Sequence, residues 1–133
     1  MKIGTILSIK LPNDKYAFAR MFKDGVIGVY QKQSISQDDF PKEEEYSFFV
    51  GIYKFSLKKW KIIGHKPFYD VDSSWPPKMF IHDVISDKYN IYYKGEIKCS
   101  TKEECMGLEC AAVWDTEQII DRLMGDNKWN ISV

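Results

Sequence analysis

The sequence predicts an α+β domain, mainly β, that spans residues 1–133: a twisted antiparallel sheet or small barrel with two short C-terminal helices packed against it. Three observations support this fold class. The length suits a single domain with its own hydrophobic core. An aromatic fraction of 15% favours pleated, half-buried surfaces. Turn-forming residues divide most of the chain into short apolar runs.

The N-terminal segment predicts an antiparallel meander. A first strand, Ile3–Leu11, ends at the turn-forming residues Pro12-Asn13-Asp14. Two further apolar runs, Tyr16–Phe22 and Val26–Tyr30, flank Asp24-Gly25. Both residues of this dipeptide tolerate a positive φ, so it suits a tight hairpin.

The middle of the chain alternates between polar and apolar segments. Residues 31–46 are polar and contain Pro41, which predicts a linker or a short helix. Tyr46–Tyr53 is a continuous apolar run, suited to a central strand that is buried on both faces. Lys58–His65 alternates, and one face of this strand is expected to carry Trp60, Ile62 and Gly64.

The segment that follows predicts a loop and then a pair of strands. Lys66–Lys78 contains three prolines and is expected to be a loop. Met79–Ile85 and Asn90–Lys98 are expected to form a further hairpin or extended pair around a turn at Asp87-Lys88.

Two capping boxes indicate helices near the C-terminus. Thr101-Lys102-Glu103-Glu104 fits one box, and Asp115-Thr116-Glu117-Gln118 fits a second. An apolar stripe follows the second box, and Gly125 is a natural helix stop. The chain is therefore predicted to contain about seven strands followed by two short helices.

The charges give no net attraction to nucleic acid or to an anionic membrane, because Lys plus Arg and Asp plus Glu both number 19. They are unevenly distributed. Residues 1–66 carry 12 basic and 7 acidic side chains, and residues 67–133 carry 7 and 12. We interpret this imbalance as an indication of a polar face for a partner.

The expected compartment is the cytoplasm. The N-terminal apolar run is interrupted by Gly4, Thr5 and Ser8, so no signal peptide is expected. No stretch approaches the ~18 apolar residues of a membrane span. An odd number of cysteines, three, favours a reducing environment.

The cysteines lie close together, which raises the question of a zinc or redox site. If Thr101 opens a helix, Cys105 and Cys110 are directed about 140° apart around its axis. Cys99 precedes the cap, and a fourth zinc ligand would have to come from elsewhere in the chain. We expect the sulfur atoms to pack as small hydrophobic groups, with neither a metal nor a cofactor bound.

Enzymatic chemistry has few candidates. The two histidines are His65 and His82. His82 is followed by Asp83, but adjacent strand residues point to opposite faces, so the two side chains cannot simply pair as an oriented base. The paired carboxylates lie in polar segments and not in the apolar pocket that acid–base catalysis requires. We do not expect an enzyme, and His82 is the one base to test.

An alternative is a small β-barrel that binds nucleic acid. The stretch FSLKKWKIIGHKPFY places Trp60 and Phe68 among the lysines Lys58, Lys59, Lys61 and Lys66. Alternation on any strand with one solvated face produces the same pattern. The balanced total charge also deprives binding of its usual phosphate contribution.

The segment TKEECMGLECAAVWDTEQIIDRL, residues 101–123, resembles the C-terminal signature of the immunity protein 26 family of bacterial polymorphic toxin systems. The shared features are a Thr-x-x-Glu-Cys cap, Gly-Leu-Glu, Ala-Ala-Val-Trp and an Asp-led helix that ends near Asp-Arg-Leu. The opening GTILSIKLPNDKYAFARMFKDGVIGVY is similar to the family's first hairpin, and SSWPPKMFIHD to its double-proline segment. The resemblance is weakest at residues 31–60.

The resemblance implies a largely β immunity protein that is made beside a toxin gene. Such a protein would bind its cognate toxin in the cytoplasm and inhibit it stoichiometrically, protecting the producer and its siblings in contact-dependent competition. Affinity would come from buried aromatic anchors, and on-rate and specificity from charged groups. The polar loops with aromatic companions supply the predicted partner-binding residues, Asp38, Asp39, Phe40, Glu43, Glu44, Glu45, Asp70, Asp72 and Trp75.

Overall fold

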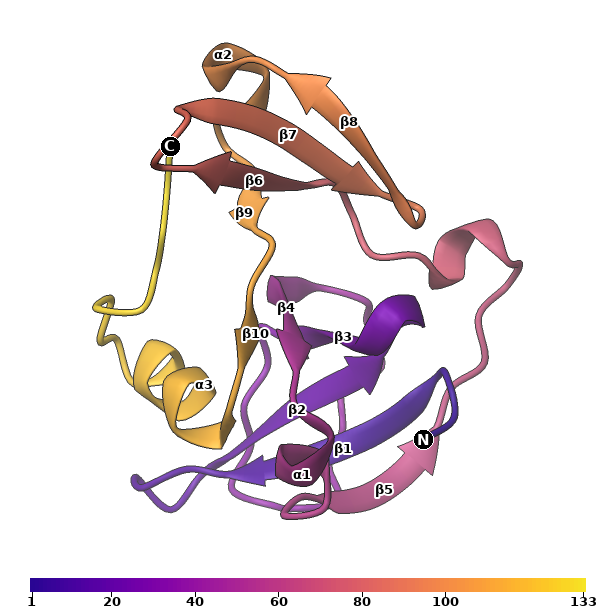
Figure 1. Ribbon diagram of the computed structural model, residues 1–133. Helices are drawn as coiled ribbons and strands as arrows, with labels where there is room; N and C mark the ends of the chain where they lie inside the picture. Colours follow the sequence, from indigo (N-terminus) through magenta and orange to yellow (C-terminus); the bar gives the residue numbers. More distant parts are fainter.

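The computed structural model describes residues 1–133 and consists of two β-sheets with a few short helices (Figure 1). Strands account for 38% of the residues and helices for 17%, so the predicted mainly β class is confirmed. The larger sheet has the strand order β10-β4-β3-β2-β1-β5, and the smaller sheet has the order β8-β7-β6-β9. None of the helices has the length and apolar character that crossing a membrane requires.

The larger sheet contains β1 (Thr5–Lys10), β2 (Tyr16–Met21), β3 (Val26–Tyr30), β4 (Tyr46–Ile52), β5 (Lys61–His65) and β10 (Val113–Trp114). The smaller sheet contains β6 (Met79–Asp83), β7 (Lys88–Tyr93), β8 (Glu96–Ser100) and β9 (Glu109–Cys110). The helices are α1 (Lys54–Leu57), α2 (Lys102–Cys105) and α3 (Thr116–Leu123), with 3₁₀ turns η1 (Lys23–Gly25) and η2 (Asp72–Ser74).

The predicted N-terminal meander is confirmed. β1 pairs antiparallel with β2, and β2 with β3. The hairpin between β2 and β3 places Asp24 at φ 65° and Gly25 at φ 67°, both in the left-handed region. The backbone N–H of Phe22 donates to the Val26 carbonyl at 2.8 Å and closes the turn. The positive-φ tolerance of Asp-Gly thus produces the local structure that the sequence indicates.

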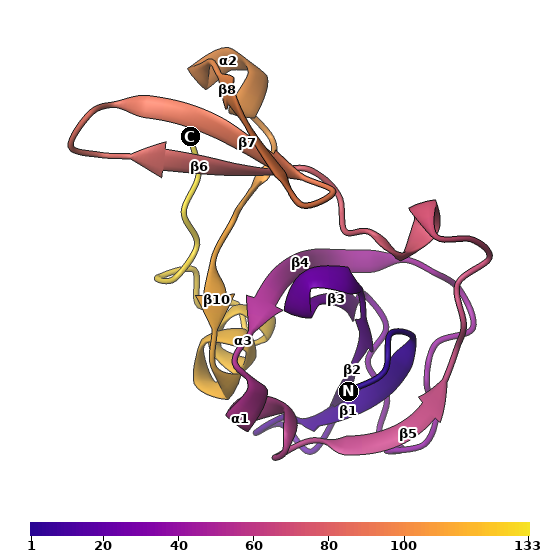
Figure 2. The ribbon, with the colours of Figure 1, turned by 45° about the vertical axis from the view of Figure 1, so that its right-hand side comes forward.

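The larger sheet curls around the main hydrophobic core but does not close into a barrel (Figure 2). Its edge strands, β5 and β10, are not neighbours in the strand order. The helix α1 lies at the opening between these edges (Figure 2). Leu57 of this helix and Trp60 just after it are buried in the core together with Trp114. The predicted twisted sheet is therefore present, and the small barrel is not.

The predicted strand Lys58–His65 is wrong in its first half. Trp60 precedes β5 and is only 8% exposed, whereas Ile62 is 56% exposed, so the two do not share a buried face. A tight turn, in which the Trp60 N–H donates to the Leu57 carbonyl at 3.2 Å, directs the indole into the core before the strand begins. The predicted central strand Tyr46–Tyr53 is confirmed as β4, which lies between β3 and β10.

The smaller sheet contains one more hairpin than the sequence predicts. The stretch Asn90–Lys98 is not a single strand, because Lys94 at φ 50° and Gly95 at φ 78° reverse the chain between β7 and β8. The strand β9 pairs parallel with β6, and β10 pairs parallel with β4. Neither short parallel strand is predicted from the sequence, since each is held by a partner far along the chain.

The first C-terminal helix is shorter than predicted. Thr101 does accept a hydrogen bond from the Glu104 N–H at 3.2 Å, as expected for a cap. However, α2 ends at Cys105, because Met106 is already extended at ψ 134° and forms a turn with Gly107 at φ 82°. The Leu108 N–H closes this turn on the Cys105 carbonyl at 3.2 Å. Cys110 therefore lies on β9, and the helical separation of Cys105 and Cys110 does not apply.

The second C-terminal helix matches the prediction. Asp115 and Gln118 form a complete capping box at the start of α3. At the other end, Gly125 at φ 90° donates to the Arg122 carbonyl, and the Asp126 N–H donates to the Asp121 carbonyl. These two bonds form the Schellman arrangement that terminates helices.

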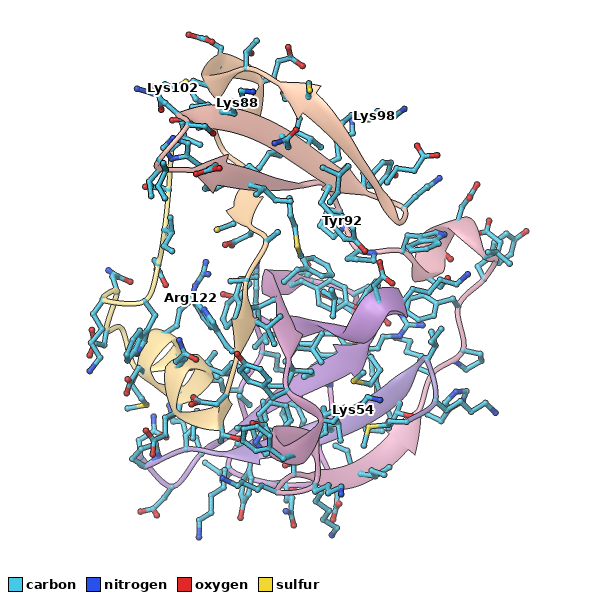
Figure 3. The ribbon with its side chains drawn as sticks, viewed as in Figure 1. Lys54, Lys88, Tyr92, Lys98, Lys102 and Arg122 are labelled. Carbon is cyan, nitrogen blue, oxygen red and sulfur yellow. The ribbon has the colours of Figure 1, made fainter.

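The helices pack on different sheets. α2 contacts β7 of the smaller sheet, and α3 contacts β10 of the larger sheet. Arg122 on α3 (Figure 3) donates to both carboxylate oxygens of Glu109 at 3.0 and 2.7 Å, and its guanidinium lies 4.1 Å from the Phe48 ring centroid. This pair ties α3 to the segment that connects the two sheets.

Candidate functional site

The predicted acidic residues before β4 lie in the loop 31–45, which joins β3 to β4. Asp38 lies 3.8 Å from Lys61. Asp39 accepts from the Ser34 hydroxyl at 3.0 Å and pairs with Lys32 at 3.4 Å, and these contacts lower the pKa of the Asp39 carboxyl. Both aspartates are therefore compensated by lysines of this chain.

Three of the remaining predicted residues in this loop differ in their surroundings. Phe40 is half-buried and packs against the small cluster of Ile6, Phe18 and Tyr30. Glu43 and Glu45 are exposed and form no ion pair. They line a shallow surface pocket together with Lys32, Pro41 and Lys42.

Glu44 is the predicted residue that the fold places in a network. Its carboxylate pairs with Lys66 at 2.7 Å and with Arg20 at 3.0 Å, and it also accepts a hydrogen bond from the Tyr46 hydroxyl. Burial raises the pKa of Glu44, but hydrogen bonds from Lys66 and Tyr46 and the charge of Arg20 outweigh it, so the pKa is lowered overall. The carboxylate is thus held in its ionised form.

Arg20 is the centre of this network and is 5% exposed. Its guanidinium donates to the Lys66 carbonyl at 3.1 and 2.7 Å and to the Pro67 carbonyl at 3.0 Å. The same group lies 3.6 Å from the centroid of the Phe68 ring. β2 therefore fixes the start of the loop 66–78, which is far away in the sequence.

Two tyrosines lie beside the network: Tyr30 is fully buried and Tyr46 is half-buried. Their rings stack with centroids 4.7 Å apart. Burial raises the pKa of Tyr46 to about 12, and burial together with hydrogen bonding to Tyr46 raises the pKa of Tyr30 further. Both phenols therefore remain neutral hydrogen-bonding groups at any physiological pH.

The second predicted group lies in the loop 66–78. Asp72 pairs with Lys94 of the β7–β8 turn at 3.2 Å, which raises the pKa of that lysine. Asp70 accepts from the Ser73 N–H at 2.8 Å. The Lys23 ammonium lies 4.7 Å from the Trp75 ring centroid. Asp72 and Trp75 therefore connect the loop to its surroundings, whereas the Asp70 contact lies within the loop.

The structure brings the two predicted groups together at one point only. Lys66 reaches from the second loop to the Glu44 carboxylate, and it also donates to the Lys42 carbonyl at 2.9 Å. Asp38, Asp39, Glu44 and Asp72 all have cationic partners within the chain. Among the predicted acidic residues, only Glu43, Glu45 and Asp70 have no cationic partner.

The histidines have partners that the sequence does not indicate. His82 Nε2 lies 2.8 Å from the Asp87 carboxylate, and its ring stacks on Tyr89 with centroids 4.1 Å apart. Asp83 instead accepts backbone N–H groups of its own turn. His65 Nε2 lies 3.0 Å from the Ile3 carbonyl.

The cysteines have three different environments. Cys105 is fully buried and directs its sulfur toward the Asn90 carbonyl at 3.8 Å. Cys110 is half-buried, which raises the pKa of its thiol, and Cys99 is exposed. The prediction of buried sulfur is therefore right for Cys105 and wrong for Cys99. The structure contains no cluster of three or more His, Cys, Asp or Glu side chains suited to a metal ion.

The structure removes the main support for the nucleic-acid alternative, which is an exposed Trp60. The Trp60 ring belongs to the main core, so it cannot stack on a base. Phe68 is covered by the Arg20 guanidinium on one face. Lys66 forms an ion pair with Glu44, and Lys61 with Asp38, so neither lysine is free for a phosphate.

A further surface feature is not predicted from the sequence. A hollow of about 530 Å³ lies between the N-terminal segment, the η1 turn and α1. Its floor is formed by the buried side chains of Met21, Phe22, Ile52 and Leu57. Lys54 of α1, which is labelled in Figure 3, lines the hollow together with Lys23 and Lys58. We call this feature the lysine-rimmed hollow; only the lysine-rich composition of residues 54–59 could have indicated it.

The fold and its surfaces define a small β-rich protein, and comparison with protein-family models places it among the immunity proteins. The matching model is that of Immunity protein 26, and the match covers residues 2–91. The chain belongs to this family, which confirms the resemblance seen in the sequence. No curated protein and no solved structure matches the chain.

The family match and the sequence resemblance rest on partly different residues. The matched range 2–91 includes the loop 31–45, the Arg20–Glu44–Lys66 network and the lysine-rimmed hollow. The C-terminal segment 101–123, which first indicates the family, lies outside it. Family membership therefore rests mainly on the curled sheet and the loops that surround it.

Proposed function

We propose that this protein binds a cognate bacterial toxin in the cytoplasm and neutralises it by forming a stoichiometric complex. Membership of the Immunity protein 26 family is the observation that carries this proposal, because it implies a toxin as partner. The setting that the sequence resemblance implies, a polymorphic toxin system used in contact-dependent competition, belongs to the same proposal. Inhibition by binding needs a complementary surface and no catalytic group on the inhibitor.

The surface offers two regions with the properties that such a complex uses. The acidic loops present Glu43 and Glu45 without ionic partners, next to half-buried Phe40. The lysine-rimmed hollow presents apolar surface surrounded by cations. Apolar anchors supply most of the binding free energy in protein complexes, and peripheral charges supply association rate and specificity.

Co-expression with the adjacent open reading frame tests the proposed function. We expect the chain to restore growth and to co-purify with the toxin domain encoded there. Titration of the toxin's activity should show a break at about one equivalent, because a binding inhibitor is consumed one for one. Inactivation by a small fraction of an equivalent would instead show catalysis, and the proposal would be wrong.

A variant of the histidine that contacts a carboxylate distinguishes binding from catalysis further. His82→Ala removes the group that lies 2.8 Å from Asp87 and is the one candidate general base. We expect neutralisation by this variant to equal that of the wild type. A large loss, with the fold intact by circular dichroism, would favour an enzymatic role.

The predicted toxin contacts of the acidic loop need a separate variant, because the protein could neutralise the toxin through another surface. Glu43→Ala with Glu45→Ala removes the two carboxylates of the loop that have no ionic partner. If these residues contact the toxin, the complex should weaken by about tenfold. Glu103→Ala with Glu117→Ala is a matched control, since these two carboxylates are also exposed and form no ion pair. Unchanged affinity of the Glu43 and Glu45 double variant would remove this loop from the interface.

A further inference from the structure

The lysine-rimmed hollow combines an apolar floor with cations that have no anionic partner. Its floor residues, among them Phe22, Ile52 and Leu57, are each less than a tenth exposed. Lys23, Lys54 and Lys58 line its walls, and none of them lies within 4.0 Å of a carboxylate. Ion pairs elsewhere on the chain compensate Lys32, Lys61, Lys66, Lys94, Lys98 and Lys128.

The charge around the hollow is strongly one-sided. Asp24 is the single carboxylate among its lining residues. Lys59 extends the basic surface along the chain from α1, and its ammonium lies 5.9 Å from the Phe55 ring centroid. Burying these lysines against a neutral partner would cost desolvation free energy without compensation. The hollow therefore suits a partner that supplies carboxylates.

Two exposed aromatic rings adjoin this basic surface. Phe55 is 57% exposed and Tyr53 is 46% exposed, and their rings stack with centroids 5.5 Å apart. Stacking holds both rings in place without burying them, so little side-chain entropy remains to be lost on binding. Rigid aromatic side chains next to a charged rim are typical of the residues that dominate binding energy in protein complexes.

The hollow lies at the opposite end of the larger sheet from the acidic loop. In the β3–β4 pair, Val26 faces Gly51 at the end near η1 and α1, whereas Tyr30 faces Tyr46 at the end where the loop 31–45 begins. The acidic carboxylates at that far end are largely neutralised by lysines of the chain. Glu43 and Glu45 remain unpaired at that end, as do Lys10 and Lys15, so its free charges are of both signs. The free charges around the hollow are mainly those of lysines.

From these observations we propose that the lysine-rimmed hollow docks an acidic segment of the cognate toxin, with an apolar side chain on the floor and carboxylates against Lys54 and Lys58. This inference rests on the proposed function, since it names the surface through which the toxin is bound. Charge complementarity selects the occupant. A nucleic acid is less well suited, because the floor is apolar and the exposed rings of Phe55 and Tyr53 are not among the residues that line the hollow.

Charge reversal of two rim lysines tests the inference. The probe is the toxin domain encoded by the adjacent open reading frame, and affinity and association rate are measured at about 50 and 500 mM salt. The double variant Lys54→Glu with Lys58→Glu should weaken binding by about ten- to a hundredfold at low salt, mainly through the association rate. The difference should shrink at high salt, because exposed charges are then screened.

A variant at the other end of the sheet is the matched control. Lys10 and Lys15 are exposed and form no ion pair, so Lys10→Glu with Lys15→Glu changes the net charge equally. We expect its affinity to stay within about threefold of the wild type. All four lysines are solvated, so both variants should fold, which circular dichroism and thermal unfolding would verify.

The outcomes separate this inference from the proposed function. If the wild type does not bind the toxin, the proposed function and the inference both fall. If the wild type binds and the two double variants bind equally well, the hollow is not the docking site although the proposed function stands. Two other occupants would also overturn the inference. These are a second copy of the chain, seen as self-association that the rim variant abolishes, and a short single-stranded oligonucleotide that only the wild type binds.

Discussion

Replacement of Arg20 by methionine is the most direct perturbation of the polar network that joins the loops to the larger sheet. Methionine keeps the unbranched apolar stem of the side chain but removes the guanidinium. The Lys66 and Pro67 carbonyls then lose their donors, and Glu44 loses one of its two cations. The Phe68 ring also loses the group that lies 3.6 Å from its centroid.

The structure sets the expected size of the effect. Removal of one partner of a buried ion pair costs about 3–5 kcal/mol. The lower end applies here, because the Glu44 side chain is 34% exposed and keeps its contact with Lys66. We therefore expect Arg20→Met to lower the free energy of unfolding by about 3 kcal/mol. For a chain of this length that corresponds to a fall of roughly 10 °C in Tm.

Urea unfolding followed by tryptophan fluorescence measures this change. Arg20→Lys keeps the charge but cannot donate to several acceptors at once, so it should cost about half as much. Lys32→Met, which removes an exposed ion pair with Asp39, is the control and should cost less than about 0.5 kcal/mol. If Arg20→Met cost less than about 1 kcal/mol at an unchanged m-value, the network would not stabilise the fold as we argue.

The same network makes stability depend on pH in a definite direction. The pKa of Glu44 is lower in the folded state than its ordinary value of 4.5. Its contribution is therefore fully present above that value and is lost as the pH falls through the lowered folded pKa. Between about pH 5 and pH 3, Glu44→Gln should lose less stability than the wild type. Parallel pH profiles of the two proteins would contradict this assignment.

Three further predictions concern the core, a helix cap and the thiols. Gly28→Ala should destabilise the fold by about 2 kcal/mol in urea unfolding, because the added Cβ would lie 2.7 Å from the Tyr46 ring; a neutral effect would mean that the ring moves freely. Asp115→Ala should cost about 1 kcal/mol through loss of the α3 capping box, and an unchanged Tm would show that the cap is dispensable. A thiol reagent should label Cys99 rapidly in the native protein and Cys105 only after unfolding; fast native labelling of both would contradict the burial.

Local features of the chain were predictable because they depend on neighbouring residues. Asp24-Gly25 forms its hairpin because both residues occupy positive φ, a property of their own backbones. Asp115 and Gln118 cap α3 because they are three residues apart at a helix start. The strands of the first meander follow from short apolar runs between turn residues. The mainly β class could be predicted because such short runs fill most of the chain.

The candidate surfaces could be predicted only in part. The sequence indicates charged loops with aromatic neighbours, but it does not show that Asp38, Asp39, Glu44 and Asp72 are compensated by lysines of the same chain. It likewise does not separate Trp60, which is buried, from Phe55, which is exposed. The periodicity of a strand cannot reveal a tight turn that precedes it.

Residue patterns alone were enough to predict the fold class, the hairpin at Asp24-Gly25, the cap of α3 and the resemblance to an immunity protein family. Tertiary structure decided the division into two sheets, the parallel strands β9 and β10, and the lysine-rimmed hollow. It also decided the Arg20 network, in which the bond to Lys66 joins residues 46 positions apart. Such contacts depend on how distant segments pack, and no local pattern of residues shows which distant segments will meet.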